Sequence, residues 1–261
     1  MTLNLTPVGI LMCAAMAAWL VGIVLYALST RGRHAAFVGG AVIALAAFVT
    51  RWAEVGHIPL QSLFEVFLTL SVLLWPLWWF CQKFLGARWP VSVLAVGVVL
   101  LFPTNFIFSQ IPERLPPALY SPLFGPHVLA YMVSYTAIIL AAVQSVLQLT
   151  KSQDSPSARQ YEQASSRIVK LAFPLLTLGL ILGAVWGKLC YGDYWNWDPK
   201  ELWALATWVL AVAYLHLRGL YGNRFSKINA ILVILVAVLV ILTLVWISAA
   251  KIFNGYHTYS A

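Results

Sequence analysis

Long apolar runs, separated by short polar segments, recur along the whole 261-residue chain. Each run holds about 20 residues, enough for a helix to cross a hydrocarbon core of roughly 30 Å. Lipid offers the backbone no hydrogen-bond partners, and the runs are too long for barrel strands, so they predict transmembrane helices. Eight spans are predicted, at about 7–29, 35–54, 61–84, 90–108, 127–150, 169–187, 199–221 and 227–249. The expected fold is an all-α integral membrane bundle, organised as a single transmembrane domain over 1–261.

The composition excludes an ordinary soluble domain. Hydrophobic residues make up 62% of the chain and charged residues 9%, whereas about a quarter of a soluble domain is charged. A net charge of +8 is also found in proteins that bind nucleic acid, but here the basic residues stand in short connections between the runs. That placement is typical of topology determinants. We therefore expect a lipid bilayer as the surroundings and no nucleic acid as a partner.

The basic residues predict an orientation. With the N-terminus outside, the inner connections collect eleven of the sixteen lysines and arginines and the outer side collects five. This ratio favours both termini on the outer face. The only sizeable inner connection is 151–168, which is polar and expected to be partly helical. The outer connection 109–126 holds five prolines and is expected to be an ordered, extended segment.

The most unusual stretch is the outer tryptophan-rich loop, residues 186–204. It connects the sixth and seventh predicted spans, at about 169–187 and 199–221. The stretch from Trp186 to Trp208 holds five of the twelve tryptophans of the chain. Aromatic rings are common at membrane interfaces, so a bland interfacial belt is one interpretation. Gathered on one loop with glycines and acids, the rings would instead offer a flat apolar surface for a large planar ligand. Asp198, Pro199 and Glu201 predict a helix start with a capping box.

Two histidines fall on the side of this loop. His127 opens the fifth span and His257 lies in the outer tail. Imidazole is the usual neutral axial ligand of haem iron, and two outer histidines framing an aromatic surface would suit bis-imidazole binding. Two interfacial histidines without a ligand remain the alternative. His34 and His57 are interpreted as interfacial.

Two ionisable residues are expected within the spans. His216 lies about 17 residues into its helix and hence roughly 25 Å from the outer end. It is either a functional group at membrane depth or a side chain that snorkels beside Arg218. Glu65, one turn into the third span, is expected to pair with Arg51 or His57 as a buried structural pair.

The three cysteines, Cys13, Cys81 and Cys190, lie far apart in sequence. No C-x-x-C pair occurs, so neither a zinc site nor a redox dithiol is indicated. No C-x-x-C-H occurs either, and the chain is therefore not expected to carry covalently attached c-type haem itself.

The segment Gly192–Glu201, GDYWNWDPKE, resembles the tryptophan-rich WWD domain of the CcsA/ResC family. That family is the membrane subunit of the system II cytochrome c synthase. Further likeness lies in Gly56–Glu65, in His127-Val128 with Ser134-Tyr135, in Tyr214–Arg218 and in Tyr256–Tyr259. It spans the chain from about residue 51 to the end. Tyr191 stands where family members often have another tryptophan, and an aromatic ring is retained there.

The resemblance implies a haem-handling, translocating subunit of a cytochrome c synthase (haem lyase). It would present haem b at the outer face for thioether attachment to the C-x-x-C-H motif of apocytochrome c. By position, His127 and His257 would be the outer axial ligands of the haem iron, and His216 would be a ligand of a site within the membrane. The porphyrin platform would comprise Trp186, Gly192, Tyr194, Trp195, Trp197, Asp198 and Trp203.

The resemblance also implies partners and a location. A CcsB/ResB-like membrane subunit would supply the second histidine of the membrane site, and a thioredoxin-like protein would reduce the thiols. The membrane would be a bacterial inner membrane or a thylakoid-type membrane, with the WWD loop on the periplasmic or lumenal side. The alternatives are a CcmC-like haem delivery protein and, from a different class, a bis-histidine b-type electron-transfer cytochrome. The latter would need histidine pairs at matched depth, and only His216 lies within a predicted span.

Overall fold

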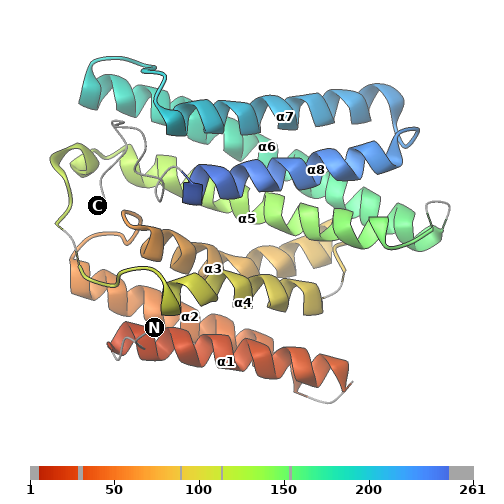
Figure 1. Ribbon diagram of the computed structural model, residues 1–261, viewed down its shortest axis with the longest axis horizontal. Helices are drawn as coiled ribbons and strands as arrows, with labels where there is room; N and C mark the ends of the chain where they lie inside the picture. The colour runs from red at the N-terminus through yellow and green to blue at the C-terminus, as the bar shows by residue number, and fades with distance from the viewer. Residues whose placement is uncertain (1–5, 29–31, 89, 113, 153–154, 247–261) are drawn as a thin grey trace. The chain divides into compact units, whose positions relative to one another are not determined.

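A computed structural model describes residues 6–28, 32–88, 90–112, 114–152 and 155–246, and within these ranges the secondary structure is helical. The α-helices are α1 (Pro7–Ala27), α2 (Arg33–Val55), α3 (Leu63–Phe80), α4 (Pro90–Phe106), α5 (Phe124–Leu149), α6 (Pro156–Tyr191), α7 (Pro199–Tyr221) and α8 (Ser226–Ile241) (Figure 1). Single π-helical turns, Cys81–Leu85 and Leu242–Trp246, extend α3 and α8, and a 3-10 turn covers Pro117–Tyr120.

All eight apolar runs are helices, which confirms the predicted all-α membrane fold. Seven of the helices in the described ranges are long and apolar enough to cross a membrane. The remaining one, α4, is apolar but shorter, with 17 residues. The exact number of crossings and the outer position of both termini stay predictions.

The described residues divide into two compact units. Unit 1 comprises Met1–Trp79 and Trp89–Pro116, and unit 2 comprises Phe80–Arg88 and Pro117–Ala261. The single domain expected over 1–261 stays a prediction. The tryptophan-rich loop, His127 and His216 all belong to unit 2.

Unit 1 contains the buried ion pair that the sequence led us to expect. Arg51 Nε donates to Glu65 Oε1 at 3.0 Å, with both side chains almost fully buried. Arg51 Nη1 also donates to the carbonyl of Gln110 at 2.8 Å, and Glu65 Oε2 accepts from the backbone N–H of Gln61 at 2.9 Å. The pair thereby fastens the end of α2 to the start of α3 and to the segment after α4.

The inner connection predicted over 151–168 is mostly helix. Ser155 caps α6, its hydroxyl accepting from the N–H of Ala158 at 3.2 Å, and the helix then runs for 36 residues. Tyr161, Ala164 and Ile168 are buried in this polar part. Hydropathy detects only the apolar portion of such a helix, whereas a helix continues for as long as one of its faces is buried.

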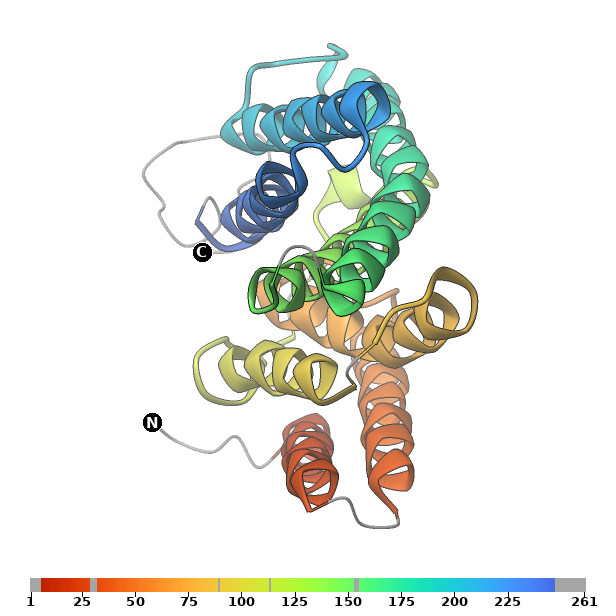
Figure 2. The same cartoon turned by 90° about the vertical axis from the view of Figure 1, so that its right-hand side faces the viewer.

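In unit 2, α8 lies between α5 and α7 (Figures 1 and 2). The closest pair is α5 and α6, which meet along small buried residues such as Ala137, Ala141 and Ala172. The hydroxyls of Ser145 and Ser165 are hydrogen-bonded across this seam at 2.9 Å. Small residues allow helices in membranes to approach closely, and this contact places the start of α5 against the last turns of α6.

Candidate functional site

The site begins at His127, in the first turn of α5 rather than at its first residue. Its Nδ1 lies 2.8 Å from the carbonyl oxygen of Gly179 on α6. Its ring stacks on Trp186, with centroids 5.9 Å apart and planes 19° apart. The edge of Tyr131 meets it at 5.1 Å. A carbonyl accepts but cannot donate, so this hydrogen bond places the ring proton on Nδ1 and the lone pair on Nε2.

Two glycines of α6 make room for these rings. A Cβ built at Gly183 would lie 2.5 Å from His127 Cε1, and one at Gly179 would lie 3.1 Å from the ring of Tyr131. The two glycines are four residues apart and therefore share one face of the helix. Tyr131, Gly179 and Gly183 were not among the residues singled out in the sequence. The small-xxx-small spacing of the glycines is the signal that points to such close approach.

Trp186, whose ring stacks on that of His127, is itself held in place by buried contacts. It is only 2% exposed, and its Nε1 donates to the carbonyl of Ala118 at 3.1 Å. The same carbonyl lies 3.4 Å from Cys190 Sγ, and Tyr191 meets Trp186 edge-on with centroids 5.5 Å apart. Trp186 therefore belongs to the packed interior of unit 2, unlike the exposed rings of the loop that follows.

The loop starts at a left-handed residue. Gly192, at φ +91°, ends α6 and donates its N–H to the carbonyl of Lys188, a conformation that glycine adopts without a Cβ penalty. Lys188 Nζ donates back to the carbonyl of Gly192 at 2.5 Å and lies 5.6 Å from the ring centroid of Tyr194. One cation thus rests against the first exposed ring of the loop.

The predicted capping box at the start of α7 is confirmed. The Asp198 carboxylate accepts from the N–H of Lys200 at 2.8 Å and also from that of Glu201. In return, Glu201 Oε2 accepts from the N–H groups of Asn196 at 2.8 Å and Asp198 at 3.2 Å. Glu201 therefore fixes the backbone of the loop itself as well as the helix start.

The exposed rings of the loop are Tyr194 and Trp197, at 60% and 68% exposure. Trp197 has φ +56° and is the only residue besides glycine with a positive φ in the described ranges. A bulky residue in this region is strained, and such strain clusters at ligand sites. Trp195 meets Trp197 edge-on, at 6.0 Å and 85°, and Trp203 is half-buried one turn into α7. The rings present edges as well as faces.

Two donors of the loop have no hydrogen-bond partner in the described part of the chain. These are Trp195 Nε1 and Asn196 Nδ2, both buried within half-buried side chains. Buried polar groups nearly always have a partner. The loop thus has two donors that no acceptor among the described residues satisfies.

His216 lies far from this loop. It is exposed on α7, with Nδ1 3.0 Å from the carbonyl of Val212 one turn earlier, and it stands 18 residues after Asp198, about 27 Å along the helix. His257 lies outside the described residues. His34 contacts the hydroxyl of Tyr26 at 2.9 Å, and His57 the carbonyl of Ile58 at 3.0 Å. Among the described histidines, His127 alone meets the tryptophan-rich segment in the contacts above.

The helices and the loop define a polytopic α-helical membrane protein with a histidine seated against a tryptophan-rich segment. Comparison with known sequences gives the family. The model of a family described as "Cytochrome C assembly protein" matches residues 10–251. The protein from Porphyra purpurea called "Cytochrome c biogenesis protein CcsA" is 33% identical over 224 residues, which cover 65% of this chain and 69% of that protein.

Proteins of the same name from Chlamydomonas reinhardtii and from Synechococcus sp. (strain CC9902) are 33% and 29% identical over 203 and 240 residues. The aligned parts cover 70% and 74% of this chain, and 57% and 77% of those proteins. The chain thus spans little more than half the length of the Chlamydomonas protein. The chain belongs to the CcsA family of cytochrome c assembly proteins.

Proposed function

We propose that this protein acts in cytochrome c maturation as the haem-handling subunit of a system II synthase. Its substrates would be haem b and an apocytochrome with a C-x-x-C-H motif. The name "Cytochrome c biogenesis protein CcsA", which the relatives above share, supports this role.

The setting of His127 carries the proposal. A histidine that ligates a metal almost always donates its other ring N–H to a carboxylate, a backbone carbonyl or water, which fixes the tautomer and the ring orientation. His127 has that arrangement through Gly179, and Trp186 holds the plane of its ring. An imidazole prepared in this way is suited to offer Nε2 to iron.

The loop supplies surroundings that fit a porphyrin. Tyr194 and Trp197 are exposed apolar rings, and aromatic faces and edges both make favourable contacts with a planar π-system. The donors of Trp195 and Asn196 are neutral, and their N–H groups complement the acceptor oxygens of haem propionates. Lys188, which contacts the ring of Tyr194, adds a positive charge beside them.

The other roles follow the predicted positions. His257 would be the second axial ligand of the outer site. His216, exposed on α7, would be one ligand of a site within the membrane that a CcsB/ResB-like subunit completes. The subunits together would form the haem lyase, served by a thioredoxin-like protein that keeps the apocytochrome thiols reduced. The membrane would be a bacterial inner or thylakoid-type membrane, with the loop on the periplasmic or lumenal side.

Absorption spectroscopy tests the ligand assignment. The protein is purified with and without its ResB-like partner, as wild type and as the His127→Ala and His257→Ala variants. His34→Ala is the matched control, because His34 belongs to unit 1 and its ring is hydrogen-bonded to the hydroxyl of Tyr26. We expect a low-spin haem spectrum in the wild type and the control, and lost or altered axial coordination in the two test variants. Maturation of a reporter cytochrome c should fail in the same two variants.

Three other outcomes would contradict the assignment of His127 and His257 as haem ligands or the use of the control. Unchanged haem in both test variants would move the ligands elsewhere and favour a b-type cytochrome. A haem-free protein in both wild-type preparations would leave the aromatic loop as a protein interaction surface. Haem loss in His34→Ala as well would indicate a general loss of structure.

A further inference from the structure

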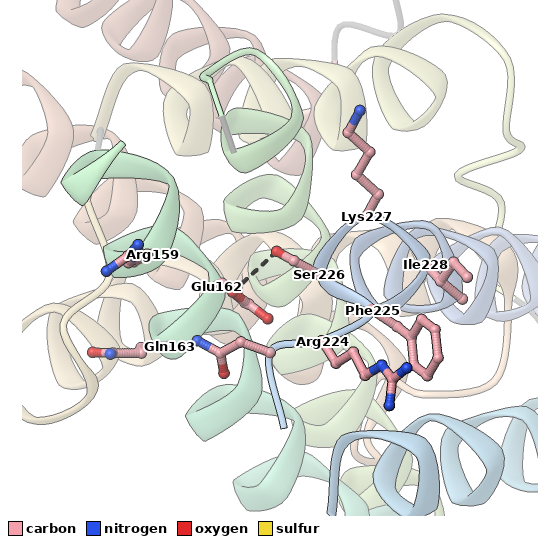
Figure 3. A pocket seen from close by; sticks show the side chains of 9 residues that line it. Arg159, Glu162, Gln163, Arg224, Phe225, Ser226, Lys227 and Ile228 are labelled. Atoms are coloured by element: carbon pink, nitrogen blue, oxygen red, sulfur yellow. Dashed lines mark hydrogen bonds between the residues drawn. The ribbon is translucent and has the colours of Figure 1, made fainter. Parts of the chain in front are cut away.

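At the other end of unit 2 lies a pocket that the proposed function does not use. It has a volume of about 650 Å³ and is formed by the N-terminal part of α6, the turn between α7 and α8, and the first residues of α8 (Figure 3). Along α6, Arg159 stands 32 residues before Tyr191, about 48 Å at the rise of an α-helix. The pocket is thus separate from the tryptophan-rich loop.

The wall of the pocket is strongly basic. Arg159, Arg224 and Lys227 line it, and all three are exposed. In Figure 3, Arg159 lies on one side of Glu162 and Ser226, whereas Arg224 and Lys227 lie on the other and extend in different directions. Among the described residues, the only acid in the lining is Glu162. Its carboxylate is already engaged by Arg218 through an ion pair and by the Ser226 hydroxyl at 3.0 Å. No ion pair is formed by the three lining cations within the described residues. The pocket therefore has a net attraction for anions.

An apolar stripe leads away from the pocket along α8. Ile228 belongs to the pocket lining and is 49% exposed. Further exposed residues follow at helical spacing on the same face: Ile231, Leu235, Val238 and Ile241. This face is turned away from α5 and α7, against which α8 packs. The cationic pocket thus stands directly at the end of a surface suited to hydrocarbon chains.

We propose that this pocket binds the headgroup of an anionic phospholipid, with an acyl chain along the exposed stripe of α8. Basic pockets between transmembrane helices on the side rich in lysine and arginine are suited to anionic lipid headgroups. The lipid would bridge α6 and α8 and hold the α7–α8 turn. A free phosphate would satisfy the cations but would make no use of the adjoining apolar stripe, which is why the lipid is the ligand favoured here.

Native mass spectrometry of the full chain in detergent tests the proposal. The probes are phosphatidylglycerol and phosphatidylcholine of equal acyl chains. The wild type should retain phosphatidylglycerol in preference, and an Arg159→Gln/Arg224→Gln/Lys227→Gln variant should lose this preference, by roughly fivefold in affinity for each charge removed. The matched control, Arg33→Gln/Lys83→Gln/Arg88→Gln, removes the same charge from other predicted inner positions and should bind like the wild type. Lys227→Gln alone provides a milder test if the triple variant does not fold.

The proposal fails if the pocket variants retain phosphatidylglycerol as the wild type does, or if the control variant loses it to the same extent. Displacement of the lipid by millimolar inorganic phosphate would identify a free-anion site, and displacement by haem would assign the pocket to the haem path. Either result overturns the lipid assignment. The readout is lipid retention, so the outcome is independent of whether His127 ligates haem.

Discussion

At the scale of the residue, His127 can pack against α6 because α6 has a glycine where a larger side chain would collide with its ring. The missing side chain at Gly183 leaves space for the imidazole, and the carbonyl of Gly179 accepts a hydrogen bond from its Nδ1–H. Trp186 then closes the other side of the ring. A histidine held by packing and by a hydrogen bond is oriented before any ligand arrives, which lowers the cost of binding.

Gly183→Ala tests this arrangement. The new Cβ would lie 2.5 Å from His127 Cε1, so the ring must move and its hydrogen bond to Gly179, worth about 1 kcal/mol, is lost. The ring is a movable side chain, and we therefore expect an inserted, folded protein. Its haem spectrum should resemble that of His127→Ala.

Gly219→Ala is the control, because a Cβ at that helical position meets nothing within 4 Å. Helix propensity favours alanine over glycine by up to about 1 kcal/mol. The control should therefore keep the wild-type spectrum with an equal or slightly higher Tm. A wild-type spectrum in Gly183→Ala would show that the close packing does not orient the ligand.

At the scale of the element, the loop is ordered by the helices that it joins. Gly192 ends α6, and the capping box of α7 reaches back into the loop through Glu201. The strained backbone of Trp197 lies between the two N–H groups that Glu201 holds, those of Asn196 and Asp198. The helix start and the exposed tryptophan are therefore energetically linked.

Glu201→Ala should loosen the loop. Loss of a capping interaction costs about 1 kcal/mol, so the amides of Asn196 and Asp198 should exchange with deuterium roughly fivefold faster. Glu201→Gln keeps an oxygen acceptor without the charge. Its amide exchange rates should lie between those of Glu201→Ala and those of the wild type. Equal exchange in all three proteins would mean that the loop is ordered by other contacts.

The ion pair of Arg51 and Glu65 provides a second test at this scale. Removal of one partner of a buried pair leaves an uncompensated charge and costs about 3 to 5 kcal/mol. Glu65→Ala should lower the Tm, because the buried guanidinium of Arg51 then keeps only the longer, 3.6 Å ion pair with the partly exposed Glu54 among the described residues. The double variant Arg51→Met/Glu65→Leu should recover part of that loss, and Thr50→Ala on the same helix should stay close to wild type. A double variant as unstable as the single one would indicate that the bonds to Gln110 and Gln61 matter more than the pairing.

At the scale of the whole molecule, the excess of basic residues on one side predicts the direction in which the helices cross the membrane. Tyr120, which is 73% exposed, lies in the predicted outer connection, and Ser152 lies in the predicted inner one. The tryptophan-rich loop should share the side of Tyr120, and the basic pocket the side of Ser152.

Single cysteines at these two positions test the orientation. The three native cysteines are replaced by serine or alanine, and Tyr120→Cys and Ser152→Cys are introduced separately. In sealed vesicles with the outer face exposed, a maleimide that cannot cross the membrane should label the first and spare the second. The reverse pattern would place the loop on the inner face and contradict the proposed presentation of haem to an external apocytochrome.

The sequence by itself determined the helical membrane fold and the capping box at Asp198 and Glu201. For Glu65 it offered Arg51 and His57 as alternative partners, and the structure decided in favour of Arg51. Hydrophobic length, local capping chemistry and the scarcity of acids in the spans each act over short stretches of chain. The family resemblance is strongest in the tryptophan-rich segment, recurs in shorter segments from about residue 51 to the end, and is likewise visible in the sequence. Only the tertiary structure decided that Trp186 stacks on His127 and that Gly179 and Gly183 leave room for the rings of Tyr131 and His127. It also decided that Arg159, Arg224 and Lys227 line one pocket at the start of α8. Those relations depend on how separate helices pack, and helix packing is set by contacts between residues far apart in the chain.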